Sequence, residues 1–105
     1  MSFITYAAYP STPGGRFDLN YYTATHMSIV SKHWKDQGLV SWDVTSFPTG
    51  GPYIALTTIV WKDAASAKKA MVPENGLQEL VDDLPKFTDI KPVQFAGTVA
   101  ASSKL

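Results

Sequence analysis

Four strand-like stretches and two helical regions follow one another in the order β-α-β-β-α-β, and this order constrains the fold most. Strands are expected at 2–9, 40–47, 53–61 and 92–99, where β-branched and aromatic residues concentrate. One helix is expected from 17 to 34, ending before Gly38, and a second over 64–71, resuming at 77–84 after an interruption. The order predicts an α+β fold, a ferredoxin-like sandwich with an antiparallel four-stranded sheet and both helices on one face.

The third expected strand is largely uncharged on both faces. Ile54, Leu56 and Val60 alternate there with Tyr53, Ala55, Ile59 and Trp61. A strand that is apolar on both sides is covered on both sides, and two helices can cover only one face of the sheet. We therefore expect a homodimer in which two sheets pack into a dimeric α/β barrel.

The composition narrows the class of protein. A chain of 105 residues is large enough for one core, so a single domain spanning 1–105 is expected. Nine basic and nine acidic residues leave no net charge to attract nucleic acid, and the lack of cysteine excludes disulfides and thiolate catalysis. The first ten residues do not resemble a signal peptide, and no apolar run approaches the roughly 20 residues of a membrane span. A soluble cytoplasmic protein without a membrane partner is the expectation.

The first helical region, 17–34, contains both histidines of the chain. Asp18 is expected to cap its N-terminus. At a regular helical period, one face of this helix collects mainly apolar side chains together with the histidines: Leu19, Tyr22, His26, Ile29, Val30 and His33. Titratable groups on an apolar face make this helix the first place to look for a functional site.

The two histidines do not predict a metal site. His26 and His33 are seven residues apart, about 10 Å along a helix, whereas two ligands on one helix need a spacing of four. No metal is therefore expected, and His33 is expected at the partly exposed end of the helix.

Two motifs resemble a known family. The stretch 17–30 reads F-D-x-x-Y-Y-x-x-x-H-M-x-x-V, and 83–88 reads D-x-P-K-F-T. With Gly38-Leu39 and Pro52-Tyr53 before the middle strands, this pattern resembles the EthD-domain proteins of the dimeric α/β-barrel superfamily. The resemblance implies a ferredoxin-like subunit that dimerises through its sheet, with a pocket between the sheet and the first helix. Such proteins are associated with ether degradation and fungal aromatic polyketide pathways, and their relatives include isomerases, decarboxylases and oxygenases that need no cofactor.

The resemblance also identifies His26 as a histidine that looks into the pocket. A near-neutral pKa would suit His26 to general acid–base catalysis, and Tyr22, one turn earlier, could orient a substrate oxygen or bond the imidazole. The alternative for both residues is a structural role in the core, with His26 bonded to a backbone carbonyl or a hydroxyl.

Aromatic residues elsewhere are candidates for the pocket walls. Trp42, Trp61 and Phe87, and also Phe95, would suit a flat apolar ligand, although core or dimer-interface packing explains each equally well. The adjacent acids Asp82 and Asp83 are expected to solvate a helix end rather than to take part in catalysis.

These features predict a small enzyme, an oxidoreductase or a lyase or isomerase, that acts on an apolar or aromatic substrate such as a polyketide or lactone. His26 and Tyr22 would be catalytic, Trp42, Trp61 and Phe87 would bind the substrate, and no cofactor is expected. Two alternatives remain open at this point. One is a non-catalytic carrier built on the same dimeric barrel, and the other is haem binding through a histidine.

Overall fold

A computed structural model describes residues 2–105 of the chain. The strands are β1 (Phe3–Pro10), β2 (Leu39–Ser46), β3 (Tyr53–Trp61) and β4 (Val93–Thr98). The α-helices are α1 (Leu19–Tyr21), α2 (Met27–Trp34), α3 (Ala64–Ala70) and α4 (Leu77–Asp83). A π-helical turn, Tyr22–His26, joins α1 to α2, and short 3-10 turns occupy Pro73–Asn75 and Leu84–Lys86. Each strand lies within one residue of its predicted bounds.

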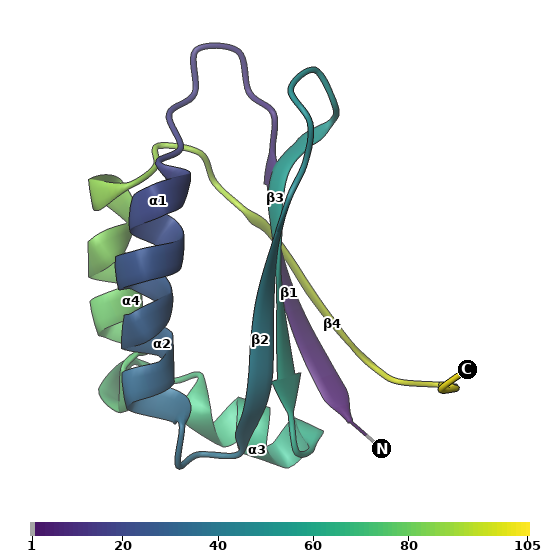
Figure 1. Cartoon of the computed structure of the whole chain (residues 1–105). Helices are drawn as coiled ribbons and strands as arrows, with labels where there is room; N and C mark the ends of the chain where they lie inside the picture. The colour runs from purple at the N-terminus through teal and green to yellow at the C-terminus, as the bar shows by residue number, and fades with distance from the viewer. Residues whose placement is uncertain (1) are drawn as a thin grey trace.

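The four strands form one antiparallel sheet in the order β2-β3-β1-β4. Figure 1 shows α1, α2 and α4 side by side on one face of this sheet, with α3 near one end of it. The architecture confirms the predicted ferredoxin-like α+β sandwich. Among residues 2–105, no helix is long and apolar enough to cross a membrane.

The helix-facing side of the sheet forms the floor of the core. Residues paired across β1 and β3 include Ala7 with Thr57 and Tyr9 with Ala55, and Thr57, Tyr9 and Ala55 are buried. Trp61 at the end of β3 packs against Trp34 of α2, with 5.4 Å between ring centroids. The apolar residues of β3 that face the helices are thus covered, as predicted.

The other side of the sheet carries no helix. Residues of the opposite parity lie there, among them Ile4 paired with Val60 and Tyr6 paired with Phe95. The Tyr6 and Phe95 rings stack with centroids 4.9 Å apart, and half of the Phe95 surface remains exposed. We call the apolar side chains of this side, which come from β1, β3 and β4, the outer face.

The first helix departs from regular α-geometry at the π-helical turn. Its N-cap is as predicted, since the Tyr21 amide donates to the Asp18 carboxylate at 3.1 Å. In the π turn, the Met27 amide donates to the Tyr22 carbonyl, five residues back. A turn of this kind inserts about one residue into the helical repeat and shifts every later side chain around the axis.

That shift changes which residues of the helix are buried. Tyr22 and His26 face the interior as predicted, but beyond them the buried positions are Met27, Val30 and Trp34. The predicted positions Ile29 and His33 are only partly buried, and Leu19 is exposed. Beyond His26, Val30 and the partly exposed His33 are as expected, but the prediction placed Ile29 inward and missed Met27 and Trp34, because it assumed an uninterrupted period of 3.6 residues.

The second helical region is interrupted at Pro73 and Gly76, as predicted. Gly76 has a φ of 105°, a left-handed conformation that favours glycine. The His33 side chain lies directly against Gly76, where a Cβ atom would collide with it. The glycine therefore lets α4 approach α2 closely and brings the end of α4 beside the first helix.

Candidate active site

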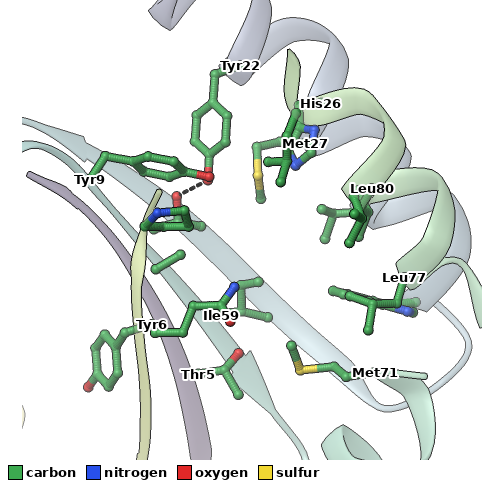
Figure 2. Close-up of a pocket in the computed structure, with 18 of the residues that line it drawn as sticks. Thr5, Tyr6, Tyr9, Tyr22, His26, Met27, Ile59, Met71, Leu77 and Leu80 are labelled. Atoms are coloured by element: carbon green, nitrogen blue, oxygen red, sulfur yellow. Dashed lines mark hydrogen bonds between the residues drawn. The ribbon is translucent and has the colours of Figure 1, made fainter. Parts of the chain in front are cut away.

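A cavity of about 350 Å³ lies between the helices and the part of the sheet formed by β1, β3 and β4. Figure 2 shows side chains of the helices, His26 and Leu80 among them, across from Thr5 and Ile59 of the sheet. Most of the lining is apolar and includes Met27, Val30, Ile59, Met71, Leu77 and Leu80. The polar residues that line it include Thr5, Tyr9, Tyr22, His26, Thr57 and Gln94.

His26 is held in the cavity wall by a carboxylate from α4. The Nδ1 atom of His26 lies 2.9 Å from Oδ2 of Asp83, and the two residues are 6% and 4% exposed. Tyr21 donates its hydroxyl to the other oxygen, Oδ1, at 2.7 Å, and the Lys86 ammonium lies 3.6 Å from Oδ1. The carboxylate therefore keeps favourable partners even when the imidazole is neutral.

This arrangement fixes the tautomer of the neutral imidazole. A carboxylate can only accept, so Nδ1 of His26 carries the proton and Nε2 carries the lone pair. Within residues 2–105, Asp83 is the hydrogen-bond partner of His26, and no protein group bonds Nε2. The free lone pair is what a general base needs.

Burial affects the pKa values of both His26 and Asp83. Desolvation lowers the pKa of His26 from its ordinary 6.5, and it outweighs the opposing effect of Asp83. Burial of Asp83 acts to raise its own pKa, but the hydrogen bonds from His26 and Tyr21 prevail and hold that pKa below the ordinary 3.8. At neutral pH the pair is thus a neutral imidazole beside a carboxylate.

Tyr22 lies beside His26, one turn earlier in the same helix. Its ring stacks on the imidazole, with centroids 5.3 Å apart and an interplanar angle of 17°. Its hydroxyl does not bond the imidazole and instead forms a hydrogen bond with the buried hydroxyl of Thr57 on β3. Tyr22 and His26, the two residues predicted to be catalytic, are thus brought together in one wall of the cavity.

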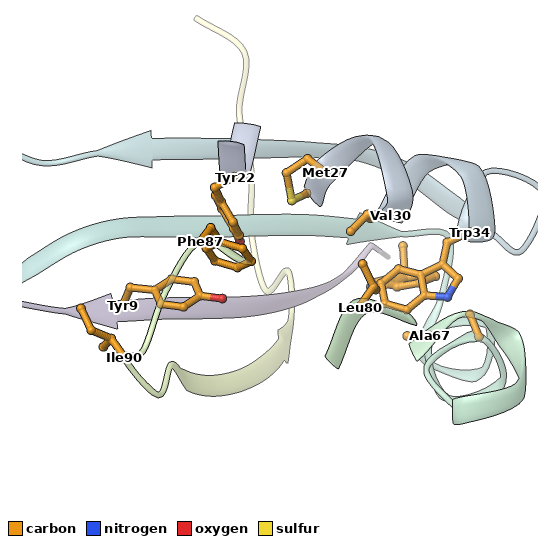
Figure 3. Close-up of a cluster of buried hydrophobic side chains, with 11 residues drawn as sticks. Tyr9, Tyr22, Met27, Val30, Trp34, Ala67, Leu80, Phe87 and Ile90 are labelled. Atoms are coloured by element: carbon orange, nitrogen blue, oxygen red, sulfur yellow. The ribbon is translucent and has the colours of Figure 1, made fainter. Parts of the chain in front are cut away.

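The three aromatic residues predicted to wall the pocket lie elsewhere. Trp61 is fully buried and donates its indole N–H to Thr5 at 3.0 Å, and Trp42 donates its N–H to Ser31 at 2.9 Å. Phe87 is fully buried behind the site, 4.7 Å from the His26 ring centroid, and Figure 3 shows it against Tyr22. None of the three lines the cavity, because each is directed into the packed core or against α2.

Asp83 is the residue that sequence reasoning missed. We expected both adjacent acids to solvate a helix end, but only Asp82 is exposed, where it accepts from Gln78 at 2.9 Å. Asp83 follows Leu80 by three residues and therefore shares the inward face of α4. That spacing, and the position of Asp83 at the start of the D-x-P-K-F-T motif, were the available signals.

No protein-family model and no curated protein matches the sequence. Among solved structures, an EthD-like protein from Ralstonia eutropha is 25% identical and superposes with a TM-score of 0.83 over 97% of this chain and 95% of that one. An EthD family protein from Bacillus halodurans is 20% identical, with a TM-score of 0.71 over 94% of this chain and 99% of that one.

A third similar structure belongs to a Bacillus cereus protein described as an antibiotic biosynthesis monooxygenase. It is 14% identical and has a TM-score of 0.65 over 100% of this chain and 97% of that one. At that identity the likeness concerns the fold alone. The two EthD structures confirm the resemblance to the EthD family on which the sequence motifs had converged. Within residues 2–105, no three metal-ligating side chains are grouped so that they could hold an ion.

Proposed function

We propose that this chain, which resembles EthD proteins in motif and in fold, is a small general acid–base enzyme that needs no cofactor. The observation that carries the proposal is the buried His26–Asp83 pair, which holds a neutral imidazole in the wall of an apolar cavity. Pairs of titratable groups whose environment sets their protonation states are typical of active sites. The reaction is an isomerisation, dehydration or decarboxylation, in which a proton is moved at an acidic carbon.

In this scheme Nε2 of His26 takes a proton from the substrate. The imidazolium that forms is stabilised by the Asp83 carboxylate, which keeps its charge and does not receive the proton. His26 then returns the proton to the product or to a leaving group. Asp83 is a positioning residue, and Tyr21 in turn fixes the carboxylate through the 2.7 Å hydrogen bond.

The cavity limits the substrate to a small, mainly apolar molecule. A volume of about 350 Å³ is at the lower end of ligand pockets and suits a molecule of one or two rings. The aliphatic and thioether groups of Leu80, Met27 and Met71 would contact such rings without specific polar recognition.

The outer face supports a homodimer as part of the same proposal. Ile4 and Val60 are partly buried on this face, Phe95 is half exposed, and no helix within residues 2–105 covers them; apolar patches of this kind mark interfaces. We expect Val60→Lys to convert the dimer to a monomer in analytical ultracentrifugation, while Leu19→Lys on the exposed part of the helix layer leaves it intact. A wild-type chain that sediments as a monomer at micromolar concentration would contradict the dimer.

The catalytic proposal can be tested with 2-indanone, a two-ring ketone with acidic C–H bonds beside its carbonyl. Proton NMR in D₂O follows the replacement of these hydrogens by deuterium. We expect His26→Ala to slow the protein-dependent exchange by about 10²- to 10⁴-fold, the usual contribution of a general base. His33→Ala is the matched control, because His33 lies on the same helix but does not line the cavity.

Exchange by His26→Ala within tenfold of the parent rate would rule out the acid–base role. A wild-type protein that binds 2-indanone but does not exchange its protons would favour the carrier alternative. In that case replacement of His26 would leave the affinity for the ketone nearly unchanged.

A further inference from the structure

Three buried hydroxyl groups meet at the wall of the cavity beside His26. They belong to Tyr9 on β1, Tyr22 on the π-helical turn and Thr57 on β3, and each residue is no more than 2% exposed. The Tyr22 and Thr57 hydroxyls are hydrogen-bonded, and the Tyr9 ring packs edge-on against the Tyr22 ring with centroids 5.5 Å apart. In Figure 2 the hydroxyls of Tyr9 and Tyr22 point toward each other, and all three residues line the cavity.

A count of protons shows that this group has a donor to spare. Three hydroxyls carry three protons, whereas the hydrogen bond between Tyr22 and Thr57 uses only one. Among residues 2–105, no further acceptor bonds the Tyr9, Tyr22 or Thr57 hydroxyl. Whichever of Tyr22 and Thr57 is the donor, O–H groups are therefore left to donate to a molecule in the cavity.

The two phenols act as donors and not as bases. Burial raises the pKa of Tyr9 far above its ordinary value, and burial also raises the pKa of Tyr22 despite the hydrogen bond with Thr57, which lowers it. Both phenols therefore keep their protons at any physiological pH. A protonated hydroxyl in a buried, preorganised position is suited to stabilise negative charge as it develops on a ligand oxygen.

The hydroxyl group and the base lie side by side. Tyr22 belongs to the hydroxyl chain, and its ring stacks on the His26 imidazole. Most of the remaining lining, including Ile59, Leu77 and Leu80, is apolar, and Thr5 and Gln94 are polar exceptions. A substrate carbon facing His26 would thus have its neighbouring oxygen within the reach of the hydroxyls.

We infer that the Tyr9–Tyr22–Thr57 hydroxyl chain is an oxyanion-binding site and that the substrate is an apolar enolisable ketone. The inference rests on the proposed function, since it takes His26 as the base that removes the proton. The site adds Tyr9 and Thr57 to the functional residues and gives Tyr22 the role of a hydrogen-bond donor.

The step balances without a co-reactant. Nε2 of His26 takes a proton from the carbon next to the carbonyl, and the electron pair of the broken C–H bond forms the C=C bond of an enolate. The carbonyl π electrons move to the oxygen, which accepts a hydrogen bond from a free O–H of the hydroxyl chain. Return of the proton from His26 to the same carbon restores the ketone, whereas its delivery to the far carbon of the dienolate of an unsaturated ketone gives an isomer, and both regenerate the base.

The test compares two ligands of the same skeleton, 2-indanone and indane, which differ only in the carbonyl. Thr57→Val keeps the shape of the side chain but removes the hydroxyl that holds the Tyr22 hydroxyl in position, so we expect it to weaken 2-indanone binding by about tenfold. The affinity for indane should stay within about twofold, since the apolar lining is unchanged. Thr58→Val is the matched control, because Thr58 is the next residue of β3 and lies on the opposite side of the sheet.

A second variant keeps the test valid if Thr57→Val does not fold. Tyr9→Phe removes a different hydroxyl of the same chain and should also weaken 2-indanone binding more than indane binding. Both variants should keep the melting temperature within a few degrees of the parent, which separates loss of the donor from loss of the fold. Equal effects on the two ligands, or no effect on either, would overturn the oxyanion site.

The outcome is distinguishable from failure of the proposed function. His26→Ala should abolish proton exchange but retain the selective effect of Thr57→Val on ketone binding. Selective ketone binding without exchange by the wild-type protein would refute the acid–base role and leave the oxygen site standing. Exchange that slows in His26→Ala but not in Thr57→Val or Tyr9→Phe would support the acid–base role and refute the oxyanion site.

Discussion

Two histidine–carboxylate pairs connect the first helix to α4, and they differ mainly in burial. His26 lies 2.9 Å from Asp83, and His33 lies 2.8 Å from Glu79. The side chains of the first pair are 8% and 4% exposed, whereas those of the second are 26% and 46% exposed. Lys32 also reaches Glu79, at 3.3 Å, so that the second pair belongs to a surface network.

The two pairs have nearly the same distance but differ in their surroundings, so distance alone does not define a functional site. Water screens the His33–Glu79 pair, and exposed pairs of this kind contribute little to stability. Burial removes water from His26 and Asp83, lowers the pKa of the imidazole and makes its hydrogen bond to the carboxylate decide the tautomer. A histidine beside a carboxylate therefore gives a surface contact at one end of the helix and a candidate base in its middle.

The largest difference between the two pairs should appear in activity when the carboxylate of each pair is replaced. Asp83→Asn leaves an amide that can donate to Nδ1 and stabilise the wrong tautomer, so we expect 2-indanone exchange to fall by about 10²-fold or more. Glu79→Gln breaks the surface pair and should leave the rate within about twofold. Proton NMR exchange rates measured side by side check this, and equal rates for the two variants would remove the distinction.

Removal of each histidine should also affect stability unequally. His26→Ala strands the buried Asp83 carboxylate with only Tyr21 and Lys86 near it, which should cost about 3 kcal/mol of unfolding free energy. His33→Ala should cost only a small fraction of that, because water solvates the exposed Glu79. Urea unfolding at pH 7.5 measures both variants, and similar midpoints would contradict the role that we give to burial.

The pH dependence of stability should reveal the lowered pKa of His26. Because the folded chain binds a proton at His26 less readily than the unfolded chain does, the unfolded state gains its proton first as the pH falls below 6.5. The free energy of unfolding should thus decrease between pH 6.5 and 5. His26→Gln should flatten this decrease in urea titrations at several pH values, whereas an unchanged slope would show that another group causes it.

Much of the fold was predictable because its signals are local. Alternating and apolar strands, Asp18 before the first helix, and Pro73 and Gly76 within the second all act through their immediate neighbours in the chain. These signals gave the order of elements, and the motif around His26 led to the correct family resemblance. Tyr22 and His26 could be placed together because they are one helical turn apart.

The remainder of the site depends on contacts between distant elements. The π-helical turn is not visible in the spacing of apolar residues, yet it decides that Met27 and Trp34 are buried. The partnership of His26 with Asp83 joins residues 57 positions apart. Trp61 and Phe87 were expected at the cavity, but only the packing of the sheet against the helices shows that they lie in the core.

The protonation state of His26 is the central claim, and nitrogen-15 NMR of the imidazoles tests it most directly. We predict that at pH 7 the His26 signals are those of a neutral ring with its proton on Nδ1, and that its titration midpoint lies below 6.5. His33, assigned through His33→Ala, provides the internal comparison. A midpoint at or above 6.5, or a proton on Nε2 in the neutral ring, would contradict the account of His26 as a base poised by Asp83.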